Sequence, residues 1–274
     1  MNAAHAAPDP GFEALTGKIA RERGFACTAY KPSCLVRRIA VRMRARGVHD
    51  YAAYARLLDG DPGEYERLLD ALTINVTKLR RNAEAWDVLE REALPALLAR
   101  PGRALRAWSA GCSSGEEPYT IAMAFARAAL AAGSPADLAR CEVLGTDIDV
   151  RSLERARAGA FAEAAFTEVP TEDRTRWFTP GWPAVAGPEL RSRIRIEPRD
   201  LLKQGPPPGP WHLITCRNVV IYFDRASQDM LFSHFHDALE PGGVLMLGKV
   251  ESLLGAARER FEPVNVRERI YRKR

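Results

Sequence analysis

A glycine-rich turn with two glutamates is the first feature of the sequence that could support chemistry. Gly111 and Gly115 bracket a turn between a short apolar run and a helical pattern, and Glu116 and Glu117 follow at the expected start of the helix. Glycines let the backbone bend sharply and let a ligand approach closely. The turn lacks the GxGxxG spacing of dinucleotide-binding loops and the GK[ST] of phosphate-binding loops. Because two carboxylates would repel a phosphate, a cationic ligand with hydroxyl groups suits this turn better.

A further acid, Asp147, directly follows the apolar run at residues 141–146. In doubly wound α/β folds, a carboxylate after the second strand accepts hydrogen bonds from ribose hydroxyls. Together with the glycine turn, it favours a nucleoside without phosphates, and S-adenosylmethionine is such a ligand. The residues alone leave a second interpretation open, in which Glu116 and Glu117 are ordinary first-turn residues and Asp147 caps a helix.

Alternating apolar runs and helical patterns predict the elements that would position these acids. The apolar runs cover residues 104–109, 141–146, 211–216 and 244–247, and the helical patterns cover residues 116–132, 149–158 and 225–239. Strands that alternate with helices in this way form a mainly parallel sheet covered by helices, so the sequence predicts an α/β fold. Residues 161–199, with several prolines and two tryptophans, interrupt the pattern and are expected to form an insertion of small strands.

The first 100 residues show a helical organisation throughout. The expected helices run from Ser33 to about Gly47, from Asp50 to Gly60, from Asp61-Pro62 onward, and from Asn82 to Leu98, before Pro101-Gly102. Capping side chains, a first-turn proline and terminal glycines support these boundaries. We expect a disordered lead-in at residues 1–10, a helical N-terminal domain at 11–72, a linker and connecting helix at 73–100, and the α/β domain at 101–274.

The bulk composition is that of a globular protein and excludes several classes. Hydrophobic residues make up 46% and charged residues 27% of the 274 residues, which is ordinary for a soluble domain. No stretch is apolar enough to cross a membrane, and the N-terminus has no secretory signal pattern. The five cysteines include no CxxC pair, and His234 and His236 point to different sides of a helix. We therefore expect a protein of the reducing cytoplasm, with neither a metal site nor membrane insertion.

Four motifs along the chain form a more specific combination. They are Leu72–Thr77 (LTINVT), Trp108–Tyr119 (WSAGCSSGEEPY), Gly145–Asp149 (GTDID) and Cys216–Asp224 (CRNVVIYFD). In this order and at this spacing, they resemble the motifs of the CheR-type chemotaxis receptor glutamate O-methyltransferases. The resemblance extends from about Gly11 to Tyr271, which is nearly the whole chain.

This resemblance implies a Rossmann-like S-adenosylmethionine methyltransferase domain, a small all-α N-terminal domain before it, and a small β-subdomain, for which residues 161–199 are the candidate. It implies methyl transfer from S-adenosylmethionine to glutamate side chains of a chemotaxis-type receptor, with S-adenosylhomocysteine as the product. The residues that it places at the cofactor are Asn75, Thr77, Arg81, Gly111, Glu117, Asp147, Asp200, Leu201, Arg217 and Asn218. Arg81 and Tyr222 are expected to lie nearest the transferred methyl group and to be the catalytic residues.

The chain departs from the family pattern at three positions. Leu79 and Arg80 stand where the family usually has two aromatic residues, and Asp200 stands where it usually has asparagine. We expect Arg80 to add a charge near the active cleft. Asp200 exchanges an amide for a carboxylate, which removes a hydrogen-bond donor.

The segment between Cys27 and His49 contains no acidic residue but is rich in arginine. Its candidate docking residues are Arg37, Arg38, Arg42, Arg44 and Arg46. They form either a solvated helix face or a docking surface, and the resemblance implies a docking surface for an acidic helical region of a methyl-accepting receptor or similar signalling protein. Salt would weaken such a complex. We expect the protein to be a monomer that binds no nucleic acid.

Two further functions are compatible with the residues. The net charge of +5 permits a nucleic-acid methyltransferase, but Cys216–Val219 stands where such an enzyme would carry an Asn/Asp-Pro-Pro-Tyr-type motif. A non-catalytic protein that keeps the fold and binds the cofactor as a ligand is the second alternative. Methylation of a carboxylate fits the sequence because a glutamate is already ionised at neutral pH and needs neither a general base nor a metal.

Overall fold

The computed structural model describes residues 9–73, 76–100 and 104–274. Most of the expected lead-in at residues 1–10, the candidate residue Asn75 and the expected helix stop at Pro101-Gly102 lie outside the described residues. The chain divides into two compact units, one formed by Met1–Ile74 with Tyr222–Ser227 and the other by Asn75–Ile221 with Gln228–Arg274. The assignment of Tyr222–Ser227 to the first unit could not be read from the sequence, because its neighbours on both sides belong to the second.

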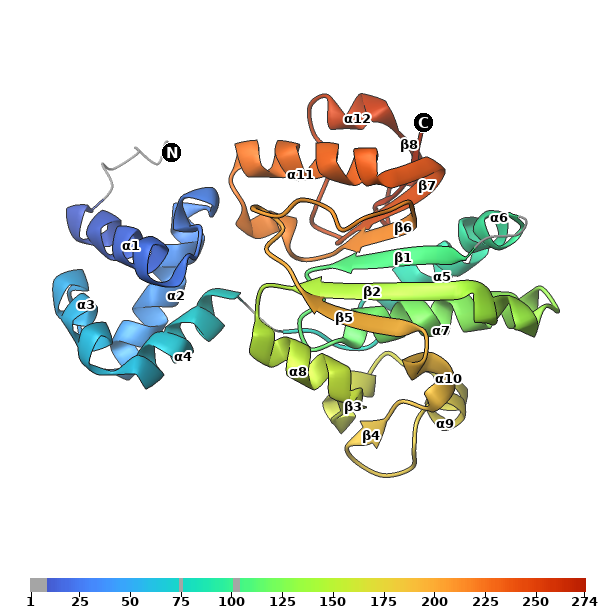
Figure 1. Cartoon of the computed structure of the whole chain (residues 1–274), viewed down its shortest axis with the longest axis horizontal. Helices are drawn as coiled ribbons and strands as arrows, with labels where there is room; N and C mark the ends of the chain where they lie inside the picture. Colours follow the sequence, from blue (N-terminus) through green and yellow to red (C-terminus); the bar gives the residue numbers. More distant parts are fainter. Residues whose placement is uncertain (1–8, 74–75, 101–103) are drawn as a thin grey trace. The chain divides into compact units, whose positions relative to one another are not determined.

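The first unit is a small helical domain (Figure 1). Its helices are α1 (Pro10–Arg23), α2 (Pro32–Ala45), α3 (Tyr51–Gly60) and α4 (Pro62–Thr73). Asp50 caps α3 as predicted, since its carboxylate accepts a hydrogen bond from the Ala53 N–H at 2.8 Å. The predicted cap at Ser33 is wrong: α2 begins one residue earlier, at Pro32, which is suited to the first helical turn because its missing N–H needs no partner there.

Apolar side chains from all four helices form the core of this unit. Leu15, Ile19, Ile39, Tyr54 and Leu68 are almost completely buried in it. Their spacing along each helix is that of an amphipathic helix with one face turned inward.

The segment Tyr222–Ser227 is attached to this helical domain by backbone and ring contacts. Tyr30 and Phe223 form an isolated antiparallel bridge, and their ring centroids lie 5.0 Å apart. The Lys31 N–H donates to the Tyr222 carbonyl at 2.9 Å, and the Asp224 N–H donates to the Ala29 carbonyl at 2.9 Å.

The second unit is built on a seven-stranded sheet with the order β5-β2-β1-β6-β7-β9-β8 (Figure 1). The strands are β1 (Leu105–Ala110), β2 (Cys141–Asp147), β5 (Ile194–Pro198), β6 (Trp211–Cys216), β7 (Leu239–Leu247), β8 (Phe261–Asn265) and β9 (Ile270–Lys273). The first five strands in this order are parallel, and β9 and β8 add antiparallel pairs. The predicted α/β fold is confirmed, while the hairpin β8-β9 was not predicted.

Helices cover both faces of this sheet. They are α5 (Ala83–Glu92), α6 (Leu94–Leu98), α7 (Glu116–Ala131), α8 (Val150–Ala158), α9 (Thr171–Trp177), α10 (Pro188–Arg191), α11 (Arg225–Ala238) and α12 (Ala257–Arg260). On one face, Ala107 packs in a core that includes α5 and α7. On the other face, the next residue, Trp108, contacts Phe235 of α11 with ring centroids 5.5 Å apart. Successive strand residues point to opposite faces, so this arrangement is the Rossmann-like, doubly wound type. None of the helices in the described part of the chain is long and apolar enough to span a bilayer.

The insertion expected at residues 161–199 contains less strand than predicted. Two short strands, β3 (Ala160–Phe161) and β4 (Ala184–Val185), form a separate antiparallel pair (Figure 1). The helices α9 and α10 occupy part of the remainder. Ile194–Pro198, which we had assigned to the insertion, instead pairs in parallel with β2 as the edge strand of the main sheet. An edge strand pairs with only one neighbour, and its other edge is free. Because polar and apolar residues alternate in this segment, the sequence did not indicate that it belongs to the main sheet.

Candidate functional site

The glycine turn joins β1 to α7, and the structure explains both of its glycines. Gly111 has a φ of +85° and Gly115 a φ of +100°, a backbone region that side chains rarely adopt. A Cβ on Gly111 would lie 2.5 Å from a methyl group of Val219, and a Cβ on Gly115 would lie 2.8 Å from the Cα of Ala156. The glycines therefore allow the turn to pack closely against its neighbours, the loop after β6 and helix α8.

Asp147 is the last residue of β2, and its carboxylate is hydrogen-bonded to the glycine turn. Its oxygens accept from the Ser113 N–H at 2.8 Å and from the Asp149 N–H at 2.9 Å. Burial raises the pKa of Asp147, and these backbone hydrogen bonds oppose the shift. Each carboxylate oxygen can accept more than one hydrogen bond, so the group keeps capacity for hydroxyl donors.

Glu117 lies in the first turn of α7 and contacts the ends of two neighbouring strands. Its Oε1 accepts from the Ser109 hydroxyl at 2.8 Å and from the Thr215 hydroxyl at 2.5 Å. Ser109 of β1 and Thr215 of β6 are register partners in the sheet. The Oε2 atom lies 3.8 Å from a guanidinium nitrogen of Arg217. Glu117 is thus fixed by both hydroxyls, and its second oxygen faces a cation.

Arg217 connects the end of β6 with the segment that precedes α5. Its guanidinium donates to the Arg81 carbonyl at 2.7 Å and to the Asn82 side-chain oxygen at 3.2 Å. It also lies over the Trp86 ring, 5.1 Å from the centroid. Burial lowers the pKa of Arg217. The structure therefore brings Glu117, Arg217 and the Arg81 backbone together, as expected of residues in one site.

The Arg81 side chain and Thr77 lie in the same segment before α5. The Arg81 guanidinium donates to the Val76 carbonyl at 2.9 Å. Thr77 is partly buried.

The loops after β5 and β6 carry three further candidates. The Asp200 carboxylate accepts from the Leu202 N–H at 2.9 Å, so it stabilises its own turn. Leu201 is buried. Asn218 has a φ of +59°, in the left-handed region where asparagine is one of the tolerated residues. Since β5 pairs with β2, Asp200 follows the strand beside the one that ends at Asp147.

Tyr222 lies in the helical unit and Arg81 in the other. The Arg38 guanidinium carbon lies 5.3 Å from the centroid of the Tyr222 ring. A guanidinium at this distance from an aromatic face is attracted by the ring. Arg38 also donates to the Ala71 carbonyl at 2.6 Å. Arg38, predicted to dock a partner, is therefore engaged with Tyr222 and α4.

The five arginines of the predicted docking surface differ in their exposure and in their ion pairs. Arg42 donates two hydrogen bonds, at 2.9 and 2.6 Å, to the fully buried carboxylate of Glu64. Arg46 lies 2.9 Å from Asp61 and 3.5 Å from Glu64. Because the buried Glu64 carboxylate is neutralised by these cations, the two arginines primarily stabilise the fold. Arg37 and Arg44 are exposed, and neither forms an ion pair within the described part of the chain.

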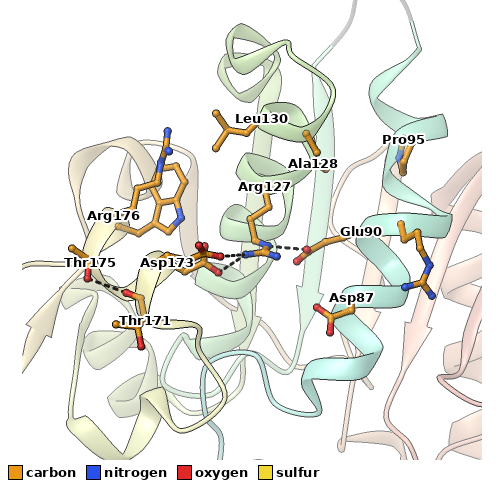
Figure 2. A pocket seen from close by; sticks show the side chains of 14 residues that line it. Asp87, Glu90, Pro95, Arg127, Ala128, Leu130, Thr171, Asp173, Thr175 and Arg176 are labelled. Atoms are coloured by element: carbon orange, nitrogen blue, oxygen red, sulfur yellow. Dashed lines mark hydrogen bonds and ion pairs between the residues drawn. The ribbon is translucent and has the colours of Figure 1, made fainter.

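The prediction that Arg80 adds a charge to the active cleft is wrong. Its side chain is almost completely buried and forms ion pairs with Asp87 at 2.5 Å and Glu90 at 2.6 Å on α5. Arg127 of α7 extends the network by donating to Glu90 and to Asp173, as Figure 2 shows. Arg127 also lines a pocket between α5, α7 and α9, at the opposite end of α7 from the glycine turn. Arg80 therefore links the segment before α5 to the helices of the domain.

Three residues of this region were missed in the sequence. Ser109 and Thr215 were assigned no role of their own, although a hydroxyl at matching positions of adjacent strands could have indicated a shared acceptor. Glu251, after β7, is 4% exposed, and its carboxylate accepts hydrogen bonds from the loop after β6. No periodic pattern or recognised motif pointed to Glu251.

Comparison with known proteins shows the family to which this chain belongs. The model of the CheR methyltransferase SAM-binding domain matches residues 75–270, and the model of the CheR methyltransferase all-alpha domain matches residues 10–73. The chain is 33% identical over 260 residues to a chemotaxis protein methyltransferase of Klebsiella aerogenes, covering 92% of this chain and 86% of that protein. It is 32% identical over 252 residues to one of Escherichia coli, covering 89% and 85%, respectively. A third, from Listeria innocua, is 33% identical over 244 residues, covering 89% and 90%.

The fold and these matches define an S-adenosylmethionine-dependent methyltransferase. The chain belongs to the CheR methyltransferase family, and it contains both the all-α domain and the S-adenosylmethionine-binding domain of that family.

Proposed function

We propose that this protein transfers a methyl group from S-adenosylmethionine to glutamate side chains of a chemotaxis-type receptor. The relatives that support this proposal carry the name chemotaxis protein methyltransferase, and the alignments span most of their length. The observation that carries it is the pair of carboxylates beside the glycine turn, Asp147 at the end of β2 and Glu117 in the first turn of α7. Two acids at this position favour a positively charged nucleoside over a phosphorylated one.

The residues present fit the cofactor. Asp147 would accept hydrogen bonds from the ribose hydroxyls, because its carboxylate is already oriented by two backbone N–H groups. Glu117 would face the positively charged part of the ligand. The remaining proposed cofactor contacts are Asn75, Thr77, Arg81, Gly111, Asp200, Leu201, Arg217 and Asn218. At Asp200, the carboxylate is used within its own turn, so we assign its contact to the loop backbone and to Leu201.

The proposed chemistry requires little beyond orientation. The bound cofactor supplies an electrophilic methyl group on a sulfonium, and the glutamate that accepts it is ionised at neutral pH. Arg81 would orient a carboxylate with its forked donors, and the Tyr222 hydroxyl would donate one hydrogen bond near the reacting atoms. Holding the reactants in line in a pocket without water provides the rate acceleration.

For the protein substrate, we propose an acidic helical region that docks on the exposed arginines of α2. Arg37 and Arg44 are the two of the five that remain exposed and without an ion pair in the described residues. Long-range attraction to an acidic surface would speed association and would weaken as salt is added.

The direct test is a methyl-transfer assay with radiolabelled S-adenosylmethionine and a purified cytoplasmic fragment of a chemotaxis receptor. The expected product is a methyl ester, so the label should be released by mild alkali. A fragment whose acceptor glutamates are replaced by glutamine should take up no label. Label that resists alkali, or that enters both fragments equally, would contradict the proposal. Full turnover by Arg81→Ala would remove Arg81 from the catalytic residues.

A further inference from the structure

The carboxylate of Glu251 lies buried between two loops and forms four hydrogen bonds to backbone N–H groups. Its Oε2 accepts from Gly248 at 2.6 Å and from Asn218 at 2.9 Å. Its Oε1 accepts from Val219 at 2.9 Å and from Ile221 at 3.2 Å. Three of these four donors come from the single loop that follows β6, while Glu251 itself follows β7.

This arrangement differs from that of Asp173, another buried acid of the domain. Asp173 is paired with Arg127 at 2.8 Å, whereas Glu251 has no ion pair among the described residues. Burial raises the pKa of Glu251, and the four backbone N–H groups oppose that shift. A buried charge without a cation is costly, and converging backbone N–H groups are the alternative means of stabilising it. The carboxylate and the loop conformation therefore depend on one another.

The loop that Glu251 holds carries several residues of the proposed site. Arg217 and Asn218 lie at its start and are two of the proposed cofactor contacts. The next residue, Val219, occupies the space beside Gly111, where a Cβ would come within 2.5 Å of its methyl group. Displacing this loop would move both residues and release the glycine turn. Glu251 itself is directed at the loop backbone and not at the candidate ligand-binding carboxylates.

We propose that Glu251 is a positioning residue: its carboxylate fixes the loop after β6 and thereby orients Arg217 and Asn218 for cofactor binding. The role of Glu251 in cofactor binding rests on the proposed function, whereas its role in fixing the loop rests on the hydrogen bonds alone. The charge is essential to this role, because only an ionised carboxylate can accept four N–H groups with both oxygens.

Hydrogen exchange of individual amides in Glu251→Gln tests the proposal without any assay of activity. The substituted amide group cannot accept at its nitrogen, so two of the four N–H groups lose their partner, and the hydrogen bonds of the other two weaken because the acceptor is no longer charged. Exchange at Asn218, Val219 and Ile221 should become about tenfold faster or more, the factor that corresponds to one hydrogen bond to a charged group. Calorimetry with S-adenosylhomocysteine should show weaker binding by a similar factor.

The matched control is Glu268→Gln. Glu268 is also buried, at 5% exposure, and lies in the connection between β8 and β9. Its substitution should leave both the exchange of the three loop amides and the affinity for S-adenosylhomocysteine unchanged. If Glu251→Gln does not fold, Glu251→Asp keeps the charge but shortens its reach, and it should accelerate exchange at the same three amides while β6 stays protected.

The outcomes separate this inference from the proposed function. Unchanged exchange at the three amides in Glu251→Gln or, where that variant does not fold, in Glu251→Asp would overturn the positioning role. The same holds if Glu268→Gln perturbs those amides equally. Faster exchange with unaltered S-adenosylhomocysteine affinity would overturn the link to the cofactor. If the wild-type protein methylates no receptor but the exchange and affinity results appear as expected, the positioning role stands and the proposed substrate is wrong.

Discussion

The guanidinium of Arg38 lies over the ring of Tyr222, with its central carbon 5.3 Å from the ring centroid. The same side chain donates to the Ala71 carbonyl at 2.6 Å, and the neighbouring Lys31 N–H donates to the Tyr222 carbonyl at 2.9 Å. Burial lowers the pKa of Arg38, but a guanidinium keeps its charge at any physiological pH. The helical unit therefore holds Tyr222 both by its backbone and by its ring.

Arg38→Met should slow methyl transfer while leaving cofactor binding unchanged. The substitution keeps an apolar stem but removes the cation at the Tyr222 ring, an interaction of about 0.5–2 kcal/mol. If Tyr222 acts at the transferred methyl group, turnover should fall about tenfold, the equivalent of about 1.4 kcal/mol. Steady-state rates and calorimetry with S-adenosylhomocysteine measure the two effects. The control is Arg56→Met, an exposed arginine of α3 outside the proposed docking surface; equal rates for both variants would refute the role of Arg38.

Asp147→Asn should weaken S-adenosylhomocysteine binding about 10–100-fold, because one acceptor oxygen for a ribose hydroxyl becomes a donor. The fold should persist, since the remaining oxygen can still accept from a backbone N–H. Asp149→Asn is the matched control two residues away, where asparagine caps α8 as well as aspartate does. Isothermal calorimetry and a thermal melt give both quantities, and wild-type affinity in Asp147→Asn would exclude this residue from the site.

Cofactor affinity should fall as the pH is lowered, and the fall should begin at a higher pH than it would for an aspartate with an ordinary pKa. Burial raises the pKa of Asp147, and only its ionised form accepts hydrogen bonds with both oxygens. Affinity is therefore fully present above this raised pKa and is lost as the pH falls through it. Titrations between about pH 7.5 and about pH 4.5 bracket the range for a raised carboxyl pKa. Asp147→Asn should show a flatter profile, and identical profiles for the two proteins would contradict the assignment.

Arg80→Met should destabilise the fold rather than alter the chemistry. It leaves Glu90 partly buried with Arg127 as its remaining partner, and breaking a buried ion pair from one side costs about 3 kcal/mol. Arg91→Met, on α5 beside Glu90 but exposed and paired only with Glu92, should cost less than about 1 kcal/mol. Denaturant unfolding measures the difference. Equal stability of the two variants would show that the Arg80 network contributes nothing.

Substitutions of the arginines of α2 should have two different effects, one on binding to a receptor fragment and one on the stability of the fold. Arg37→Ala and Arg44→Ala should weaken association and reduce its salt dependence, because exposed charges steer an acidic partner. Arg42→Ala should lower stability, because it leaves the buried Glu64 carboxylate without its bidentate partner. Binding curves at low and high salt, with unfolding curves for each variant, provide the comparison. Salt-independent binding by the wild type would contradict electrostatic docking.

Much of the fold followed from the sequence where local signals and tertiary structure agreed. The apolar run at residues 211–216 has the same bounds as β6, and the glycine turn lies between β1 and α7, as predicted. In these segments, the hydrophobic pattern, the segment length and the residues of the turn all indicate the same element. By contrast, the edge strand β5 has the polar residues Arg195 and Glu197 on one face and is only partly buried, so its alternation resembled that of a small inserted strand.

The candidate site was only partly predictable, because side-chain pairing between distant segments leaves no periodic trace. Arg80 and Arg42 were read as free charges, yet each is neutralised by acids from another turn or helix. Glu251 holds a loop about 30 residues earlier in the chain, and a single acid after a strand gives no signal of such a partner. Positions of acids and glycines could be read from spacing, but the partners of buried charges required the fold.

The measurement that most directly tests the central claim is identification of the modified atoms in a receptor fragment after incubation with this protein and S-adenosylmethionine. Peptide mass spectrometry should locate methyl groups on glutamate side chains, in amounts that fall sharply when Asp147→Asn replaces the wild-type enzyme. Methyl groups on lysine, arginine or histidine nitrogens, or an unmodified fragment alongside intact cofactor binding, would contradict it.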